Sequence, residues 1–97
     1  MLPKRETMEI EWDIQKAEAN FRKHKVSFEE AKSVFDDPLA LTVNDEAHSF
    51  DENRFITIGE SKVGRLLLVC HTIGVENVRI ISARPPTSGE RKDYEHG

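Results

Sequence analysis

Three segments rich in β-branched residues follow one another in the second half of the sequence, and only short turn-like stretches separate them. The segments span residues 54–59, 65–73 and 78–84, with turn chemistry at residues 60–64 and 74–77. Consecutive strands that are joined by tight turns pair in an antiparallel manner. This part of the chain therefore predicts an antiparallel meander, which constrains the fold more than any other feature of the sequence.

Two helices are predicted in the first forty residues. Apolar residues recur at helical spacing over residues 13–23, where Asp13 is placed as the N-cap, and the pattern repeats over residues 27–35. Ser27 and Glu30 have the spacing of a capping box, in which hydroxyl and carboxylate each satisfy a free backbone amide. The second helix therefore begins at a defined position.

Shorter segments complete the predicted order of elements. Apolar and acidic residues alternate over residues 8–12, which is typical of a half-buried strand, and residues 39–43 form another short apolar segment. Pro38 ends the preceding helix, because the residue before a proline is driven out of the helical region. Thr87 and Glu90 repeat the capping-box spacing and open a short C-terminal helix.

The resulting order, β-α-α-β-β-β-β-α, indicates the α+β class. Residues 1–97 suffice for a single domain, in which two N-terminal helices cover one face of an antiparallel sheet and a short C-terminal helix follows. The helical stripes predict the core contacts. On the helices these are Ile14, Phe21, Phe28, Val34 and Phe35, and on the sheet Leu66, Leu68 or their neighbours.

The composition argues against a membrane-spanning or disulfide-bonded protein. The longest apolar run, from Leu66 to Cys70, is far shorter than the roughly 20 residues that cross a bilayer, and the first residues lack the apolar core of a signal peptide. Cys70 is the single cysteine, so an internal disulfide is excluded. We expect a cytoplasmic protein that makes no membrane contact.

The net charge of −4 hides an uneven distribution of charge along the chain. Residues 1–28 carry +1, residues 29–60 carry −7, and residues 61–97 carry +2. A site for a polyanion can therefore be assembled from the two ends of the chain. The acidic middle is either a solvated surface without function or a docking surface for a basic partner.

Three common site chemistries find little support in the sequence. The four histidines, His24, His48, His71 and His96, do not pair with another histidine or a cysteine at ligand spacing, and His48 with Asp51 or Glu52 is a weak alternative. Cys70 lies in an apolar strand, where an inert thiol is commoner than a nucleophile. Gly59 and Gly64 flank a hairpin turn rather than cradle a phosphate. We therefore expect neither a metal nor a cofactor.

A set of polar residues remains on the predicted sheet and C-terminal helix. It comprises Arg54, His71, Arg79, Arg84, Glu90, Arg91 and Tyr94. Strand alternation predicts Arg79 and Arg84 on opposite faces, so at most one of them points toward the helices. Taken singly, each arginine is explained by a surface ion pair. Their combination suits metal-free cleavage of RNA, in which the 2′-hydroxyl attacks the adjacent phosphate. Arginine forks bind phosphate, a histidine can transfer a proton, and a tyrosine ring can stack on a base.

Both ends of the sequence resemble one family of bacterial toxins. The N-terminal signature is Trp12-Asp13, Lys16, Asn20, Lys23-His24, Phe28-Glu29-Glu30-Ala31, Val34-Phe35 and Asp37-Pro38, and the C-terminal one is Arg79 to Arg84 with Glu90-Arg91 and Tyr94. This combination, over about residues 8–95, resembles the BrnT family.

The family commonly has a glycine after the Lys-His pair. Lys25 stands there in this chain, so the turn is expected to hold a non-glycine residue at positive φ.

The resemblance implies a RelE-like fold and the ribonuclease toxin of a type II toxin-antitoxin pair, which inhibits bacterial growth. It implies a BrnA-like antitoxin of the ribbon-helix-helix type as partner, which brings the toxin into indirect contact with DNA.

The polar set then divides into expected roles. Arg54, Arg79 and Arg84 would hold the scissile phosphate and the charge that builds on it. His71 or Glu90 would transfer protons. Tyr94 would position a base, and the further contacts to RNA would come from Lys16, Lys23 and Arg91 together with Arg79.

A second hypothesis is a non-catalytic binding module that acts with its antitoxin in DNA-bound regulation of its own transcription. The acidic block of residues 29–60 suits this hypothesis, because a basic segment of the antitoxin can dock there.

Overall fold

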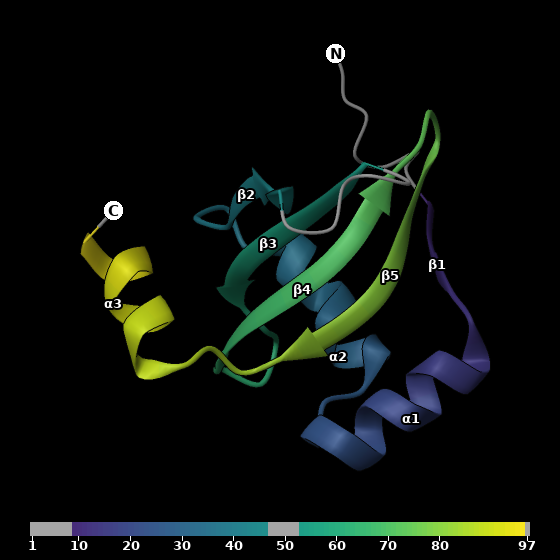
Figure 1. Cartoon of the computed structure of the whole chain (residues 1–97), viewed down its shortest axis with the longest axis horizontal. Coiled ribbons are helices and arrows are strands. Elements are labelled where there is room, and N and C mark those ends of the chain that lie inside the picture. Colours follow the sequence, from purple (N-terminus) through teal and green to yellow (C-terminus); the bar gives the residue numbers. More distant parts are fainter. Residues whose placement is uncertain (1–8, 47–52, 97) are drawn as a thin grey trace.

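The computed structural model describes residues 9–46 and 53–96. These residues form a five-stranded sheet with the strand order β1-β5-β4-β3-β2; α1 and α2 lie on one face of the sheet, and α3 stands apart at one end (Figure 1). The elements are β1 (Glu9–Trp12), α1 (Ile14–His24), α2 (Phe28–Ser33), the 3-10 turn η2 (Val34–Asp36), β2 (Leu41–Asn44), β3 (Arg54–Glu60), β4 (Leu66–Ile73), β5 (Asn77–Arg84) and α3 (Ser88–His96). The α+β class and the predicted order of elements are confirmed, while Met8 of the predicted first strand lies outside the described residues.

The predicted meander is present, but the sheet is not antiparallel throughout. Strands β2, β3, β4 and β5 pair antiparallel in sequence, whereas β1 pairs parallel with β5 from Glu9 opposite Asn77 to Trp12 opposite Ile80. Alternation over residues 8–12 predicts a strand but not its direction. The long connection through helices and strands allows β1 to enter beside β5 in the parallel sense, so the prediction of an all-antiparallel sheet was wrong.

The helix caps follow the predicted chemistry with one change. The Asp13 carboxylate and the Ser27 hydroxyl each accept a backbone N–H in the first turn of their helix, at 3.0 Å. The Glu30 carboxylate does not close the predicted box. It accepts hydrogen bonds from the Ser61 hydroxyl at 2.7 Å and from both Nε and Nη2 of Arg65. The hydrogen bonds from Arg65 hold the pKa of Glu30 below its usual value. Because Ser61 and Arg65 belong to the connection between β3 and β4, the Glu30 carboxylate ties α2 to that turn.

The connection between α1 and α2 contains a residue in the left-handed conformation, as the resemblance implied. Lys25 caps α1 with a φ of 59°, and its N–H donates to the Phe21 carbonyl at 2.9 Å. Its ammonium group donates to the Arg22 carbonyl at 3.2 Å. The turn thus keeps the left-handed conformation with a lysine in the position where the family commonly has glycine.

The core lies between the helices and one face of the sheet. Its fully buried residues are Val26, Phe28, Ala31, Val34, Leu67, Val69, Ile80 and Ala83, with Ala17 and Phe35 packed against them. The edge of one ring in the pair Trp12 and Phe28 meets the face of the other, with ring centroids 5.9 Å apart.

Two of the predicted core residues are exposed instead. Ile14 is 69% exposed and Phe21 is 50% exposed, because α1 turns Ala17 and the polar Asn20 toward the sheet. On the sheet, Leu67 and Val69 face the helices, while Leu68 faces the other side. Hydrophobic periodicity does not predict that a polar residue such as Asn20 is buried at a core position.

An irregularity in β5 decides which way its side chains point. Cys70 of β4 pairs with Ser82, yet the next residue, His71, pairs with Ile80, so Ile81 is an extra residue in β5. Such a β-bulge resets the alternation of faces. Ala83 is consequently buried, and Arg84 points to the face that the helices leave open.

The core assignment predicts different costs for two phenylalanines. Phe28→Ala should lower the free energy of unfolding by about 3–5 kcal/mol, because the buried ring leaves a cavity. Phe21→Ala should cost about 0.5 kcal/mol, since half of the ring is already in water. Urea denaturation of both variants measures the difference, and equal losses would show that the inner face of α1 is misassigned.

Candidate functional site

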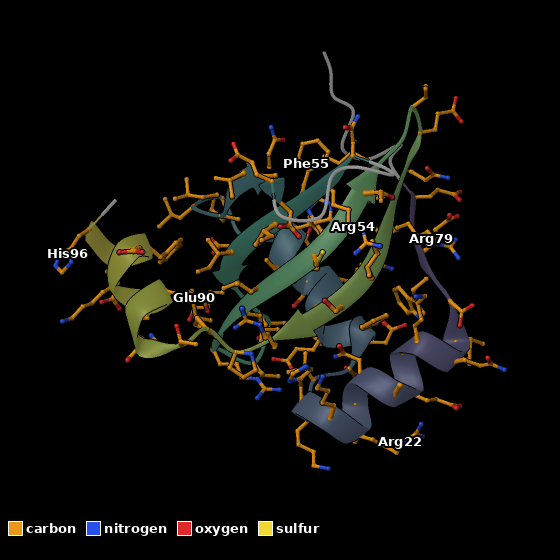
Figure 2. The ribbon with its side chains drawn as sticks, in the orientation of Figure 1. Arg22, Arg54, Phe55, Arg79, Glu90 and His96 are labelled. Atoms are coloured by element: carbon orange, nitrogen blue, oxygen red, sulfur yellow. The ribbon has the colours of Figure 1, made fainter. Side chains whose placement is uncertain are left out.

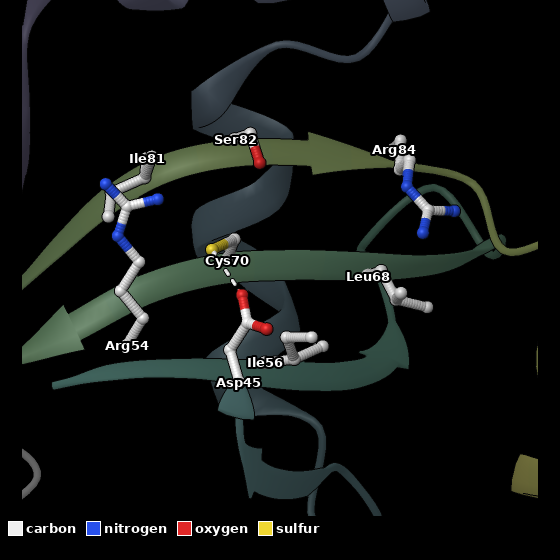
Figure 3. A pocket seen from close by; sticks show the side chains of 8 residues that line it. All are labelled: Asp45, Arg54, Ile56, Leu68, Cys70, Ile81, Ser82 and Arg84. Atoms are coloured by element: carbon white, nitrogen blue, oxygen red, sulfur yellow. Dashed lines mark hydrogen bonds between the residues drawn. The ribbon is translucent and has the colours of Figure 1, made fainter. Parts of the chain in front are cut away.

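The open face of the sheet carries a hollow of about 440 Å³. Its lining residues are Asp45, Arg54, Ile56, Leu68, Cys70, Ile81, Ser82 and Arg84 (Figure 3). We call it the open-face pocket. Arg54 from β3 and Arg84 from β5 lie at its two ends, with Asp45 and Cys70 between them. Two guanidinium groups thus lie at the ends of one hollow with a mixed polar and apolar lining.

Arg84 is held in place by the first turn of α3. Its Nη1 and Nη2 donate to the two carboxylate oxygens of Glu90, each at 2.9 Å. Glu90 also accepts the Thr87 N–H at 2.9 Å, while the Thr87 hydroxyl accepts the Glu90 N–H at 3.1 Å, so the predicted capping box is complete here. The bonds from Arg84 and Thr87 lower the pKa of Glu90 to about 2. Glu90 therefore stays ionised near neutral pH, and its two carboxylate oxygens hold the Arg84 guanidinium group in place. Its role in proton transfer stays a prediction.

Asp45 and Cys70 supply the polar groups of the pocket floor. The Cys70 thiol donates to Oδ2 of Asp45 at 3.8 Å. Burial raises the pKa of this thiol, and the nearby Asp45 carboxylate raises it further, so the thiol is not activated as a nucleophile. Sequence reasoning missed Asp45, Cys70 and Ser82 as pocket residues, because their meeting depends on strand register that no local pattern reveals.

His71 lies on the opposite face of the sheet, away from the pocket. It is 1% exposed, its Nε2 shares a hydrogen bond of 2.7 Å with the Thr57 hydroxyl, and its ring packs against Phe35 and Phe55. Burial lowers the pKa of His71 below its usual value. This position does not fit the predicted role in proton transfer to RNA, because Phe35 and Phe55 pack against the ring and it is almost fully buried.

Asn20 is a functional candidate to which sequence reasoning gave no role of its own. Its amide nitrogen donates to the carbonyls of Ala83 at 2.8 Å and Val26 at 3.0 Å, and its amide oxygen accepts the Ala83 N–H at 3.1 Å. Strand β1 pairs with β5 only as far as Ile80. The Asn20 amide therefore takes the place of a strand partner and fixes the backbone between Ser82 and Arg84.

The remaining predicted site residues lie outside the pocket. Figure 2 shows Arg79 near the same end of the sheet as the pocket residue Arg54, with Glu90 near the other end. Arg79 is paired with Glu11 at 3.2 Å, and Arg91 with Glu95 at 3.7 Å on α3. The Tyr94 hydroxyl, also on α3, donates to the Leu39 carbonyl at 3.3 Å. The last two predicted residues, Lys16 and Lys23, line a separate cleft beside α1.

The structure offers no metal-binding group of three or more His, Cys, Asp or Glu residues within residues 9–46 and 53–96. The weak alternative of His48 with Asp51 or Glu52 lies outside the described residues. Among the described helices, none has the length and apolar character needed to cross a membrane.

Comparison with known proteins decides the family. Residues 12–90 match the family model described as the ribonuclease toxin BrnT of a type II toxin-antitoxin system. The chain belongs to the BrnT family. It is also similar to the crystal structure of the Brucella abortus ribonuclease toxin BrnT, with 26% sequence identity and a TM-score of 0.66 over 84% of this chain and 100% of that one. No curated protein matches the sequence.

The comparisons confirm the predicted resemblance. The α+β architecture is shared with the Brucella BrnT structure and is consistent with the RelE-like fold that the resemblance implied. A family of type II toxins also implies an antitoxin partner.

The buried position of His71 predicts a pH dependence of stability. The unfolded chain protonates this imidazole near pH 6.5, whereas the folded chain keeps it neutral to lower pH. Below about pH 6.5 the unfolded state therefore binds more protons, and the free energy of unfolding falls as the pH decreases. Urea denaturation of the wild type between about pH 7 and pH 5 should show this loss, and His71→Gln should reduce it.

The control is the exposed His96 on α3, and His96→Gln should retain the wild-type slope. The carboxyl groups with lowered pKa, among them Glu30 and Glu90, lose their contribution mainly below about pH 5, and they do so equally in the wild type and in both variants. An unchanged slope in His71→Gln would contradict the assignment.

Proposed function

We propose that this chain is an active, metal-independent endoribonuclease and that the open-face pocket is where it cleaves RNA. In this proposal it acts in the bacterial cytoplasm, inhibits growth, and is neutralised by a BrnA-like ribbon-helix-helix antitoxin. The observation that carries the proposal is the pair Arg54 and Arg84 at the two ends of one hollow on the open face of the sheet. Guanidinium forks bind phosphate bidentately, and charge builds on the phosphate in the transition state.

Arg54 and Arg84 would bind the scissile phosphate from opposite ends of the pocket. Glu90 supports this role from outside, because its two bonds to Arg84 fix the plane of the guanidinium group. Asn20 supports it from the other side, through the backbone of Ala83. Both are positioning residues. The binding groups are therefore preorganised, so little reorganisation is needed when the phosphate gains charge.

Asp45 is the proton acceptor that the pocket itself offers, in place of the buried His71. Its carboxylate lies on the floor of the pocket between the two arginines. The 2′-oxygen would bond to phosphorus while its proton passes to Asp45. The bond from phosphorus to the 5′-oxygen would then break, and water would supply the proton that this oxygen takes up. The products are a 2′,3′-cyclic phosphate and a free 5′-hydroxyl.

The other predicted RNA contacts surround the pocket at a distance. Arg79 on the sheet and Arg91 with Tyr94 on α3 are available to parts of the RNA beyond the cleaved bond, once their contacts with Glu11, Glu95 and Leu39 are exchanged. Tyr94 retains the predicted role of stacking on a base.

A second candidate function is regulation without catalysis, in a complex of toxin, antitoxin and DNA. It is favoured by the closed pair of Arg84 with Glu90, in which the phosphate-binding fork already has a partner. In this case an antitoxin that covers the pocket would use the arginines as docking groups, and the DNA contact would be made by the antitoxin.

Cleavage of labelled RNA in excess EDTA tests the proposal. The wild type should cleave, and Arg54→Ala and Arg84→Ala should each lower the rate about 10²–10³-fold, because each removes a group that stabilises the transition state. Asp45→Asn should lower it about 10²–10⁴-fold. Arg22→Ala removes the same charge from α1, away from the pocket, and should cleave like the wild type.

Growth inhibition in a bacterial host provides the second readout. The Arg84→Ala variant should melt within a few degrees of the wild type and should no longer inhibit growth. A folded and still toxic Arg84→Ala variant would contradict the phosphate-binding role. Intact RNA at high concentration of the wild type would contradict catalysis and support the regulatory function.

A further inference from the structure

A second hollow, of about 240 Å³, lies where α1 meets the edge of β5. Its lining residues are Lys16, Ala19, Asn20, Lys23, His24, Ile81 and Ser82. We call it the α1 cleft. Three of these seven residues are lysine or histidine, namely Lys16, Lys23 and His24, and none is aspartate or glutamate.

The α1 cleft adjoins the open-face pocket. Ile81 and Ser82 line both hollows, since the bulge places them where the open face meets the edge of β5. Strand β1 covers this edge only up to Ile80, and beyond that point the edge is occupied by the Asn20 amide. No β-strand therefore lies between the two hollows, and an extended ligand can contact both of them.

The spacing of the basic groups fits an extended polyanion. Lys16 and Lys23 are two helical turns apart, about 10 Å along the axis of α1, and lie on the same side. Within the described part of the chain, neither side chain has an ion-pair partner, whereas Arg65, Arg79, Arg84 and Arg91 are each paired with a glutamate.

We propose that the α1 cleft binds the sugar-phosphate backbone of the nucleotides that flank the cleaved bond. Single-stranded RNA would run from the open-face pocket over Ile81 and Ser82 to Lys16 and Lys23. This inference rests on the proposed function of the pocket. Contacts to phosphate position a nucleic acid but carry no sequence information, so the cleft adds a dependence on RNA length and not on base identity.

The test compares two substrates of different length. A dinucleotide fills only the open-face pocket, whereas a single-stranded oligomer also reaches the α1 cleft. The wild type should show a higher kcat/KM for the oligomer. In the double variant Lys16→Gln with Lys23→Gln, the ratio of oligomer to dinucleotide kcat/KM should fall about tenfold. With two phosphate contacts removed, the negative slope of log binding constant against log salt should become less steep by about 1.4.

Two further variants separate position from charge. Lys32→Gln with Lys62→Gln removes the same charge from exposed positions outside both hollows and should keep the wild-type ratio. Ala19→Glu places a carboxylate in the cleft at little cost in helix propensity and should lower the ratio at least as much as the lysine variant.

The outcomes distinguish this inference from the proposed function. A lysine variant that loses dinucleotide and oligomer cleavage equally, or that keeps the full ratio, would overturn the α1 cleft as a subsite while the pocket stands. A wild type that neither binds nor cleaves either RNA would overturn both. An equal fall of the ratio in the control pair would show a general effect of net charge and would also overturn the inference.

Discussion

The arrangement of the open face depends on the single extra residue in β5. Without Ile81 as a bulge, strict alternation would turn Arg84 toward the helices, where Ala83 now packs. A guanidinium group buried in that core would lack water and cost several kcal/mol. The bulge keeps a small apolar residue inside and brings Arg84 to the same hollow as Arg54. The proposed phosphate site is thus a consequence of register.

The site has two supports beyond the sheet itself. Strand β1 ends opposite Ile80, so the edge of β5 past that residue needs other partners for its backbone. The buried Asn20 amide supplies them at Ala83, and α3 fixes the outward Arg84 through Glu90. Residues far apart in sequence therefore determine the geometry of one pocket.

Local patterns predicted the elements well, because caps, turns and strand alternation are decided by neighbouring residues. The Asp13 and Ser27 caps and the Thr87-Glu90 box form as expected, whereas Glu30 does not close the predicted box with Ser27. The site was predicted only in part. Arg54 and Arg84 line the same pocket, but His71 lies on the covered face of the sheet. The prediction that Arg79 and Arg84 point to opposite faces was wrong because of the bulge. Register shifts and a buried polar anchor such as Asn20 arise from tertiary contacts, which hydrophobic periodicity does not encode.

The most direct test of the account is to locate bound RNA on the folded chain. An oligomer with 2′-methoxy groups cannot be cleaved, and its titration can be followed by amide chemical shifts in NMR. We expect the largest shifts at Arg54, Cys70, Ser82 and Arg84, around the open-face pocket. Shifts confined to the outer face of α1 near Ile14 and Phe21, with the pocket unchanged, would contradict the assignment of the open face as the site of RNA binding.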